Sequence, residues 1–168
     1  KFCKWSRCIT ENTKVIFVNH EFGFPYENLQ ALKEYNLPII EDCAHSFFSQ
    51  NKEQTVGKVG DFVVFSLPKI FPIQIGGVLL HRNEDVMQSN SDLISYLDAI
   101  LNEYIPQKDR IIQERRKNYE YLKFLFENKG YQCRFKLEDN HCPGVFMFRL
   151  PEGLSAQKVK DMYWVNCV

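Results

Sequence analysis

LPIIEDC, residues 37–43, is the stretch that decides the fold, because a nearly apolar run is expected of a strand in a parallel sheet that is covered on both faces. VIFVNH, residues 15–20, is a second β-rich run upstream of it. Between the two, residues 26–35 place leucine and tyrosine side chains at helical spacing. The three segments predict a strand, a crossover helix and a parallel strand in a sheet that is covered on both faces.

Two more strands are predicted downstream. DFVVFS, residues 61–66, follows a polar loop punctuated by glycine, and GGVLLHR, residues 76–82, follows a loop that carries Lys69. An open parallel or mixed sheet binds its ligands at the carboxyl ends of its strands. Asp42, Ser66 and Lys69 all fall at that edge, so we expect these three side chains to converge.

Composition and charge limit the classes of partner. The chain has 168 residues, enough for one globular domain with a sizeable core. Its 21 basic and 21 acidic residues cancel, which argues against nucleic acid and anionic membranes and favours a small molecule or a protein. No apolar stretch reaches about 18 residues, and the charged start KFCKWSRC is unlike a signal peptide, so a cytoplasmic protein is expected.

The six cysteines show no CxxC pair, which favours reduced thiols. His141 and Cys142 are adjacent residues of metal-binding types, but no second pair follows at zinc spacing. HCPG, residues 141–144, is therefore interpreted as a surface loop, and no metal site is predicted.

The second half of the chain is predicted to be mainly helical. Residues 83–90 are polar, residues 93–104 are amphipathic, and residues 106–128 form a long charged helix. The apolar positions of that long helix make one stripe, which leaves Arg115 and Arg116 on a solvated face. GVFMFRL, residues 144–150, then predicts a last strand, and a PEG turn and a helix from Ser155 follow it.

An acid at the end of one strand and a lysine after the next are the pair that a pyridine-aldehyde cofactor requires. The acid keeps the ring nitrogen protonated, and the amine forms a Schiff base. The same region contains TKVIFVNHEFGFP, LPIIEDCAHSF and VGKVGDFVVFSLPK, followed by a glycine pair, in that order. These motifs resemble the DegT/StrS-type sugar aminotransferases, pyridoxal phosphate enzymes with the aspartate aminotransferase (type I) fold.

The resemblance implies an α/β fold. Its large domain has an open, mostly parallel sheet, and we expect residues 1–105 to be part of this cofactor-binding domain. Residues 106–168 would then be the long connecting helix and the start of a small α+β domain. Such enzymes build each active site at a dimer interface, so a homodimer is also implied.

Four residues acquire roles from the resemblance. Asp42 would pair with the pyridine nitrogen, Lys69 would be the Schiff-base lysine, Ser66 would bind the cofactor phosphate and His45 would lie near the ring. Each has a plain structural alternative. Asp42 can cap the turn after its strand, His45 can be a structural residue, and Lys69 can be an exposed loop lysine. In the catalytic reading, Ile70 to Ile73 would give Lys69 an apolar setting that lowers its pKa.

Some features of the family pattern differ here. The spacing from Ser66 to Lys69 is shorter than the family usually has, although SLPK resembles the Ser-x-x-Lys arrangement of other type I enzymes. The glycine- and threonine-containing phosphate turn would lie upstream of this sequence, and no GxNxR-type motif occurs between Val78 and Arg115. The glycine pair at 76–77 fits either a close backbone approach or a plain turn.

Three functions follow from these observations. The first is an aminotransferase that moves an amino group from an amino acid, with glutamate as the expected donor, to a keto sugar linked to a nucleotide. The second is another pyridoxal phosphate reaction, such as elimination. The third is a shortened, non-catalytic relative that acts as a binding protein. Five phenylalanines would suit a dimer surface or, alternatively, the core; they are Phe22, Phe24, Phe47, Phe48 and Phe71.

Overall fold

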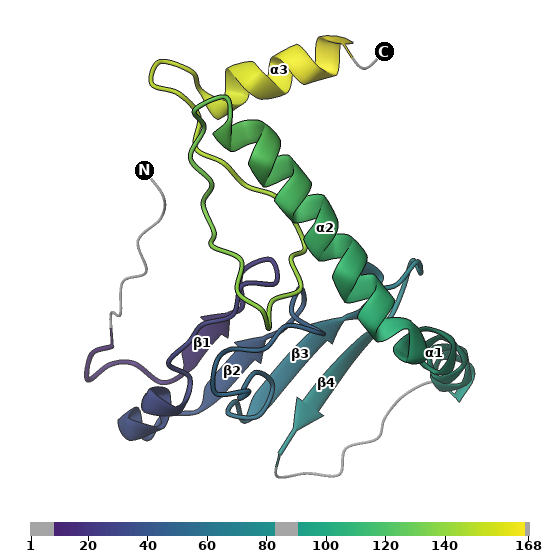
Figure 1. Cartoon of the computed structure of the whole chain (residues 1–168). Coiled ribbons are helices and arrows are strands. Elements are labelled where there is room, and N and C mark those ends of the chain that lie inside the picture. The colour runs from purple at the N-terminus through teal and green to yellow at the C-terminus, as the bar shows by residue number, and fades with distance from the viewer. Residues whose placement is uncertain (1–8, 83–90, 167–168) are drawn as a thin grey trace.

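The computed structural model describes residues 9–82 and 91–166 and shows a four-stranded sheet in the order β1-β2-β3-β4 (Figure 1). The strands are β1 (Ile16–Asn19), β2 (Ile39–Asp42), β3 (Phe62–Ser66) and β4 (Gly77–His81). The first three strands run parallel, and β4 is antiparallel to β3. The four strands predicted in the first half of the chain are therefore confirmed, in an open and mostly parallel sheet.

The crossover between β1 and β2 is a short 3-10 helix, η1 (Gln30–Tyr35), rather than the longer helix predicted over residues 26–35. The side chain of Asn51 donates to the backbone carbonyls of Tyr26 and Glu27 at 3.5 and 3.2 Å. Because these two carbonyls accept bonds from a side-chain amide, and not from N–H groups four residues later in the chain, no α-helix begins here. The turn ends at Asn36, which adopts a left-handed conformation with φ of 51°.

Apolar side chains cover one face of the sheet. The buried cluster contains Ile16, Val18, Ile39 and Val63 from the strands and Leu29 and Leu32 from the crossover. On the opposite face Phe17, Val64 and Leu79 are 60%, 39% and 63% exposed. Since side chains alternate between the two faces of a strand, the prediction of a sheet covered on both faces is wrong for the residues described.

The helical half of the chain begins beyond β4. It contains α1 (Ser91–Tyr104), the 3-10 turn η3 (Ile105–Gln107) and α2 (Lys108–Glu127), which agree closely with the predicted segments 93–104 and 106–128. The predicted polar segment 83–90 lies outside the described residues. A second buried cluster of Leu67, Ile70 and Phe71 packs against α1 and the start of α2.

The phenylalanines considered for a dimer surface mostly pack inside the protein. Phe24 and Phe71 are buried, and Phe47 and Phe48 pack against the second cluster. Phe22 is half-buried against the ring of His45. The alternative of core packing is therefore confirmed for Phe24 and Phe71, and the other three are half-buried.

From the end of α2 the chain returns to the sheet as an extended hairpin and leaves again toward α3 (Ala156–Asn166) (Figure 1). Residues 144–150 are not the predicted strand, because they form only one isolated bridge, between Cys133 and Phe148. Phe148 and Phe146 pack instead on Phe126 of α2. The predicted final helix is confirmed, and the Ser155 hydroxyl accepts the N–H of Lys158 at its start.

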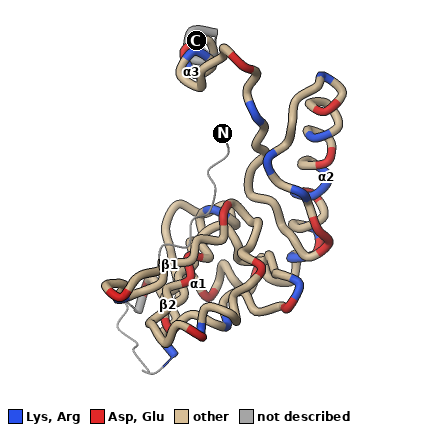
Figure 2. The backbone as a smooth tube through the Cα atoms, turned by 90° about the vertical axis from the view of Figure 1, so that its left-hand side faces the viewer, with Lys and Arg blue, Asp and Glu red and all other residues tan. Residues whose placement is uncertain are grey.

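Acidic and basic residues are interspersed along α2 (Figure 2). The prediction that Arg115 and Arg116 lie on a solvated face is wrong, because both side chains are half-buried. Arg116 donates to the carbonyls of Glu138 and His141 at 2.6 and 2.9 Å, so it fastens the returning hairpin to α2. Among the described residues, every helix is too short or too polar to cross a membrane.

Candidate functional site

The carboxyl ends of β2 and β3 bring the predicted site residues to one edge of the sheet. Asp42 is the last residue of β2 and lies beside Val64 of β3, so Ser66, two residues further along, is on the same face. The 3-10 turn η2 (Leu67–Lys69) follows at once, with Pro68 fixing its first residues. Lys69 thus ends a turn that starts directly at the sheet edge.

The Asp42 carboxylate is half-buried and has one intramolecular partner. Its Oδ1 accepts the backbone N–H of Ala44 at 2.9 Å. This bond is the turn cap considered as the alternative role, and it uses only one of the two carboxylate oxygens. Within the described residues the structure gives Oδ2 no hydrogen bond, which leaves it able to bind a ligand.

Lys69 is exposed, contrary to the apolar setting predicted for it. Its neighbours Ile70 and Phe71 point into the second buried cluster instead of surrounding the amine. In the described part of the chain, the Lys69 amine forms no ion pair or hydrogen bond, whereas its backbone carbonyl accepts a bond from Arg115 Nη2 at 3.0 Å. The turn is held by its backbone, and the amine is accessible.

His45 lies between these charges. Its ring is 4.9 Å from the ring of Phe22, with the planes tilted by 60°. Burial lowers the pKa of His45, the positive charges of Lys69 and Arg115 lower it further, and only the negative Asp42 opposes them. His45 is therefore neutral at pH 7, and these four groups are close enough to influence one another electrostatically.

A buried network that the sequence reasoning missed lies directly behind Asp42. Glu41 and His20 are both fully buried, and His20 Nε2 is 3.1 Å from Glu41 Oε2. Because His20 Nδ1 accepts the N–H of Tyr26 at 3.2 Å, the ring proton is on Nε2 and is donated to the carboxylate. His20 N–H also donates to the Asp42 carbonyl at 3.0 Å, which ties the network to the site.

Backbone N–H groups of the loop after β2 complete the network. Glu41 accepts from Gly57 at 2.7 Å, from Val59 at 2.8 Å and from Gly60. The loop passes so closely that a Cβ at Gly60 would be 2.9 Å from Glu41 Cγ. Burial would raise the pKa of Glu41, but the hydrogen bonds from His20 and the backbone outweigh burial and lower it. One sequence feature could have revealed the role of Glu41: an acidic residue inside an apolar strand that is followed by a loop punctuated by glycine.

His20 and Glu41 lie close to Cys43, and these three residue types can bind a metal ion. Ligand atoms of His20, Glu41 and Cys43 lie within 4.8 Å of one another. However, both ring nitrogens of His20 and both oxygens of Glu41 are engaged in hydrogen bonds, and burial raises the pKa of the Cys43 thiol far above its usual range. The cluster is therefore a hydrogen-bonded clamp and not a set of free ligands.

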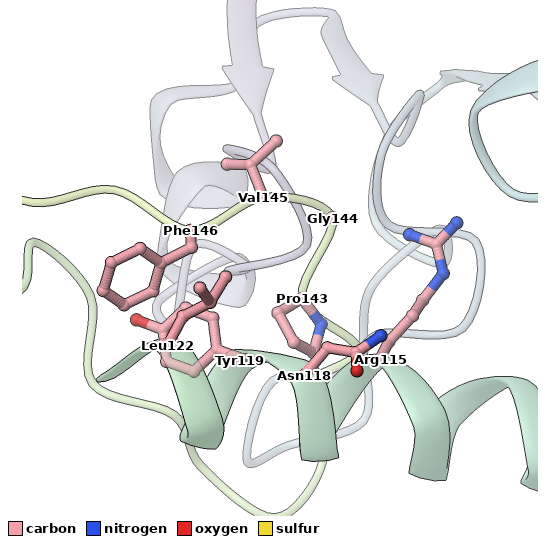
Figure 3. A pocket seen from close by; sticks show the side chains of 8 residues that line it. All are labelled: Arg115, Asn118, Tyr119, Leu122, Pro143, Gly144, Val145 and Phe146. Atoms are coloured by element: carbon pink, nitrogen blue, oxygen red, sulfur yellow. The ribbon is translucent and has the colours of Figure 1, made fainter. Parts of the chain in front are cut away.

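An open pocket of about 360 Å³ lies between α2 and the segment that follows Cys142 (Figure 3). One wall is a side of α2, with Arg115, Asn118, Tyr119 and Leu122, and the other is the extended segment 143–146. Gly144 of this segment also lies close to His45 at the sheet edge. A Cβ at Gly144 would be 3.4 Å from His45 Nδ1. In Figure 3 the Arg115 guanidinium extends away from the aromatic end of the pocket.

The wall formed by residues 143–146 is anchored by buried groups. His141 and Cys142 are 5% and 1% exposed, so the prediction of a surface loop is wrong. Cys142 N–H donates to the Ser49 hydroxyl at 2.9 Å, and Gly144 N–H donates to the Phe22 carbonyl at 2.7 Å. These bonds place a segment remote in sequence beside His45. Cys43, Cys133 and Cys142 are free thiols, and the other cysteines lie outside the described residues.

Comparison with known proteins finds relatives that match parts of this chain. The chain is 35% identical over 85 residues to an uncharacterized protein of Methanocaldococcus jannaschii, covering 48% of this chain and 22% of that protein. It is 43% identical over 61 residues to the GDP-perosamine synthase of Escherichia coli O157:H7, covering 34% and 17%. It is 28% identical over 160 residues to the L-glutamine:2-deoxy-scyllo-inosose aminotransferase of Streptoalloteichus tenebrarius, covering 73% and 38%.

The chain thus spans less than half the length of these relatives. Residues 4–95, more than half of the chain, match the model of one protein family. This match includes β1 to β4 and every residue proposed for the sheet edge. The protein therefore belongs to the DegT/DnrJ/EryC1/StrS aminotransferase family.

Proposed function

We propose that this chain contributes the catalytic sheet edge of a pyridoxal phosphate-dependent aminotransferase. The observation that carries the proposal is the convergence of Asp42, His45 and Lys69 at the ends of two adjacent parallel strands. Family membership and the name of the Streptoalloteichus relative support an amino transfer over other reactions of the same cofactor. A fold alone would not, because one fold can host several chemistries.

The residues present fit the cofactor. Asp42 has a carboxylate oxygen left for a pyridine nitrogen, Lys69 has an accessible amine, and Ser66 has a hydroxyl on the same face for a phosphate oxygen. When bound, pyridoxal phosphate supplies an electron sink for the substrate carbon. Asp42 would hold the ring nitrogen protonated through its charge, and Lys69 would attach the cofactor and carry the proton at its amine.

His45 would serve this site as a neutral ring. Its lowered pKa means that at pH 7 it adds no positive charge beside Lys69 and Arg115. The contact with Phe22 fixes one side of the imidazole, and Gly144 leaves room next to Nδ1. The ring can therefore pack against the cofactor or accept a hydrogen bond from it.

The substrate classes follow from the relatives' names and from the expected chemistry. The Streptoalloteichus relative is named for L-glutamine as donor and an inosose as acceptor, and the Escherichia relative for a GDP-linked amino sugar. We propose an amino acid donor, with glutamate tested beside glutamine, and a keto sugar acceptor linked to a nucleotide. A cytoplasmic homodimer, divided into residues 1–105 and 106–168, is part of the same proposal.

A shortened, non-catalytic relative is the second candidate, and the exposure of Lys69 favours it. An exposed amine is more strongly solvated and attacks an aldehyde less readily than a buried one. In this case Asp42 and Lys69 would be retained from the family but would catalyse no reaction.

The deciding experiment is covalent trapping of the cofactor. The purified chain is incubated with pyridoxal phosphate and reduced with borohydride, and the modified peptide is mapped by mass spectrometry. We expect one adduct per chain at Lys69, absent in Lys69→Ala, weaker in Asp42→Asn and unchanged in Lys58→Ala, which removes another exposed lysine. Labelling spread over surface lysines would favour the non-catalytic relative.

A further inference from the structure

The pocket between α2 and segment 143–146 carries an unbalanced positive charge. Of the eight residues that line it, only Arg115 is ionised at pH 7, and no acidic residue is among them. Arg115 forms one hydrogen bond within the described residues, to the Lys69 carbonyl, and that partner is neutral. A guanidinium has five N–H donors, so most of its capacity is left for a ligand.

We propose that this pocket binds a carboxylate, with Arg115 as its receptor, and that it receives the carboxylate of the amino donor. The assignment to a donor rests on the proposed function, whereas carboxylate binding itself does not. Arg115 is fastened to the turn that ends in Lys69. A ligand held by Arg115 is therefore kept next to the turn that carries the Lys69 amine, which an amino acid substrate must reach.

The pocket suits a carboxylate better than a phosphate. A phosphate site usually gathers several backbone N–H groups at a helix N-terminus, besides side chains. Here the wall is the middle of α2, where backbone N–H groups are used within the helix, and Gly144 N–H already donates to Phe22. One guanidinium fork matches the two oxygens of a carboxylate, and Asn118 is a further polar residue of the same wall.

The rest of the pocket fits a short aliphatic chain. Leu122, Pro143 and Phe146 form its apolar part, and Tyr119 is turned inward to donate to the Phe135 carbonyl at 2.7 Å. An amino acid such as glutamate carries three carbons between its two carboxylates, so its chain would lie along this apolar wall. The volume of about 360 Å³ accommodates a molecule of that size.

His45 offers a readout that does not depend on catalysis. The charge of Arg115 lowers the pKa of His45, so a bound carboxylate that neutralises Arg115 must raise it. A residue with only a structural role would not transmit this change.

The test uses the full chain without cofactor and glutarate as the probe, because glutarate has two carboxylates and no amine that could react. Affinity and the His45 titration are measured by NMR for the parent chain, Arg115→Gln, Arg115→Lys and Arg110→Gln. Arg110 is the matched control, since it is exposed on the same helix and its one hydrogen bond within the described residues is to the side chain of Gln107. His45→Gln assigns the imidazole signal.

We expect glutarate to bind the parent chain and Arg110→Gln equally, and Arg115→Gln at least about tenfold more weakly. Arg115→Lys keeps the charge but not the fork, so it should fall between them, and it provides the test if Arg115→Gln does not fold. Equal binding by Arg115→Gln, or binding of inorganic phosphate in preference to glutarate, would overturn the proposal. Arg115-dependent binding without a Lys69 adduct would uphold the carboxylate site while refuting the aminotransferase function.

Discussion

Replacing Glu41 by glutamine is expected to destabilise the folded chain by about 4 kcal/mol. The substitution is nearly isosteric, so it changes hydrogen bonding and charge without creating a cavity. Glu41 is fully buried and accepts from His20 and from three backbone N–H groups of the loop at residues 57–60. All of these partners are donors, and a glutamine amide turns one acceptor into a further donor.

The magnitude follows from the bonds that cannot be kept. Whichever way the amide is oriented, two donors lose their acceptor: either Val59 and Gly60, or Gly57 and His20. Bonds to a buried charged group contribute about 1.5–3 kcal/mol each, so losing two costs about 4 kcal/mol. Net stabilities of domains are about 5–15 kcal/mol, so the variant would approach unfolding at room temperature.

Urea unfolding followed by circular dichroism measures this loss directly. Glu53→Gln is the matched control, because Glu53 is exposed in the same loop region and should change stability by less than about 0.5 kcal/mol. A loss below about 1 kcal/mol for Glu41→Gln would refute the reasoning, since it would mean that the carboxylate is not the acceptor that organises the loop.

The same carboxylate predicts how stability depends on pH. The folded pKa of Glu41 is lowered below its ordinary value of about 4.5, so the folded state holds the charged form more strongly than the unfolded state. This contribution is complete above about pH 4.5 and is lost as the pH falls through the lower folded value. Glu41→Gln should lack this part of the acid destabilisation.

Three further changes test other parts of the structure. Gly23→Ala should destabilise by about 2 kcal/mol or more in urea unfolding, because Gly23 has φ of 91° and a Cβ there would be 2.2 Å from the Cys142 carbonyl oxygen; an unchanged midpoint would contradict the close approach. His141→Asn should reduce the loss of stability that occurs between pH 7 and pH 5 in urea unfolding. Burial lowers the pKa of His141 in the folded state, so stability is lost as the pH falls below the unfolded pKa near 6.5. An equally steep loss in the variant would mean that other groups cause it. Leu79→Gln should change stability by less than about 0.5 kcal/mol and reduce self-association in analytical ultracentrifugation, because Leu79 is 63% exposed; a large loss of stability would show that this face is covered.

The elements that the sequence predicted well are those that depend on local periodicity. The strands at 15–20 and 37–43 and the helix at 106–128 follow from alternation, apolar runs and a helical stripe, and each appears within a few residues of its prediction. The strand at 144–150 failed because a ladder also requires a partner, and the facing segment offers only one bridge. Its phenylalanines are buried by α2 and not by a sheet.

The contacts that the sequence could not predict are made by long polar side chains. Nothing in the stripe of α2 shows that Arg116 reaches three carbonyls of the hairpin or that Arg115 reaches Lys69. Such bonds depend on where two remote segments meet, and a backbone carbonyl leaves no trace in the residue pattern. The sheet edge was predictable, because Asp42 and Lys69 are positioned by their own strands, whereas the wall that faces them was not.

These two groups of contacts together define how the candidate site is built. The sheet edge supplies the acid and the amine, and it is organised from behind by the buried charge of Glu41. The opposite wall comes from α2 and the hairpin, beyond the proposed domain boundary at residue 105, and it is joined to the edge by the bonds of Arg115 to Lys69 and of Gly144 to Phe22. A shift of α2 would therefore move the turn at Lys69, because Arg115 is bonded to the backbone carbonyl of Lys69. The exposure of the Lys69 amine is consistent with this arrangement, because the amine lies where the two parts meet and is held by neither.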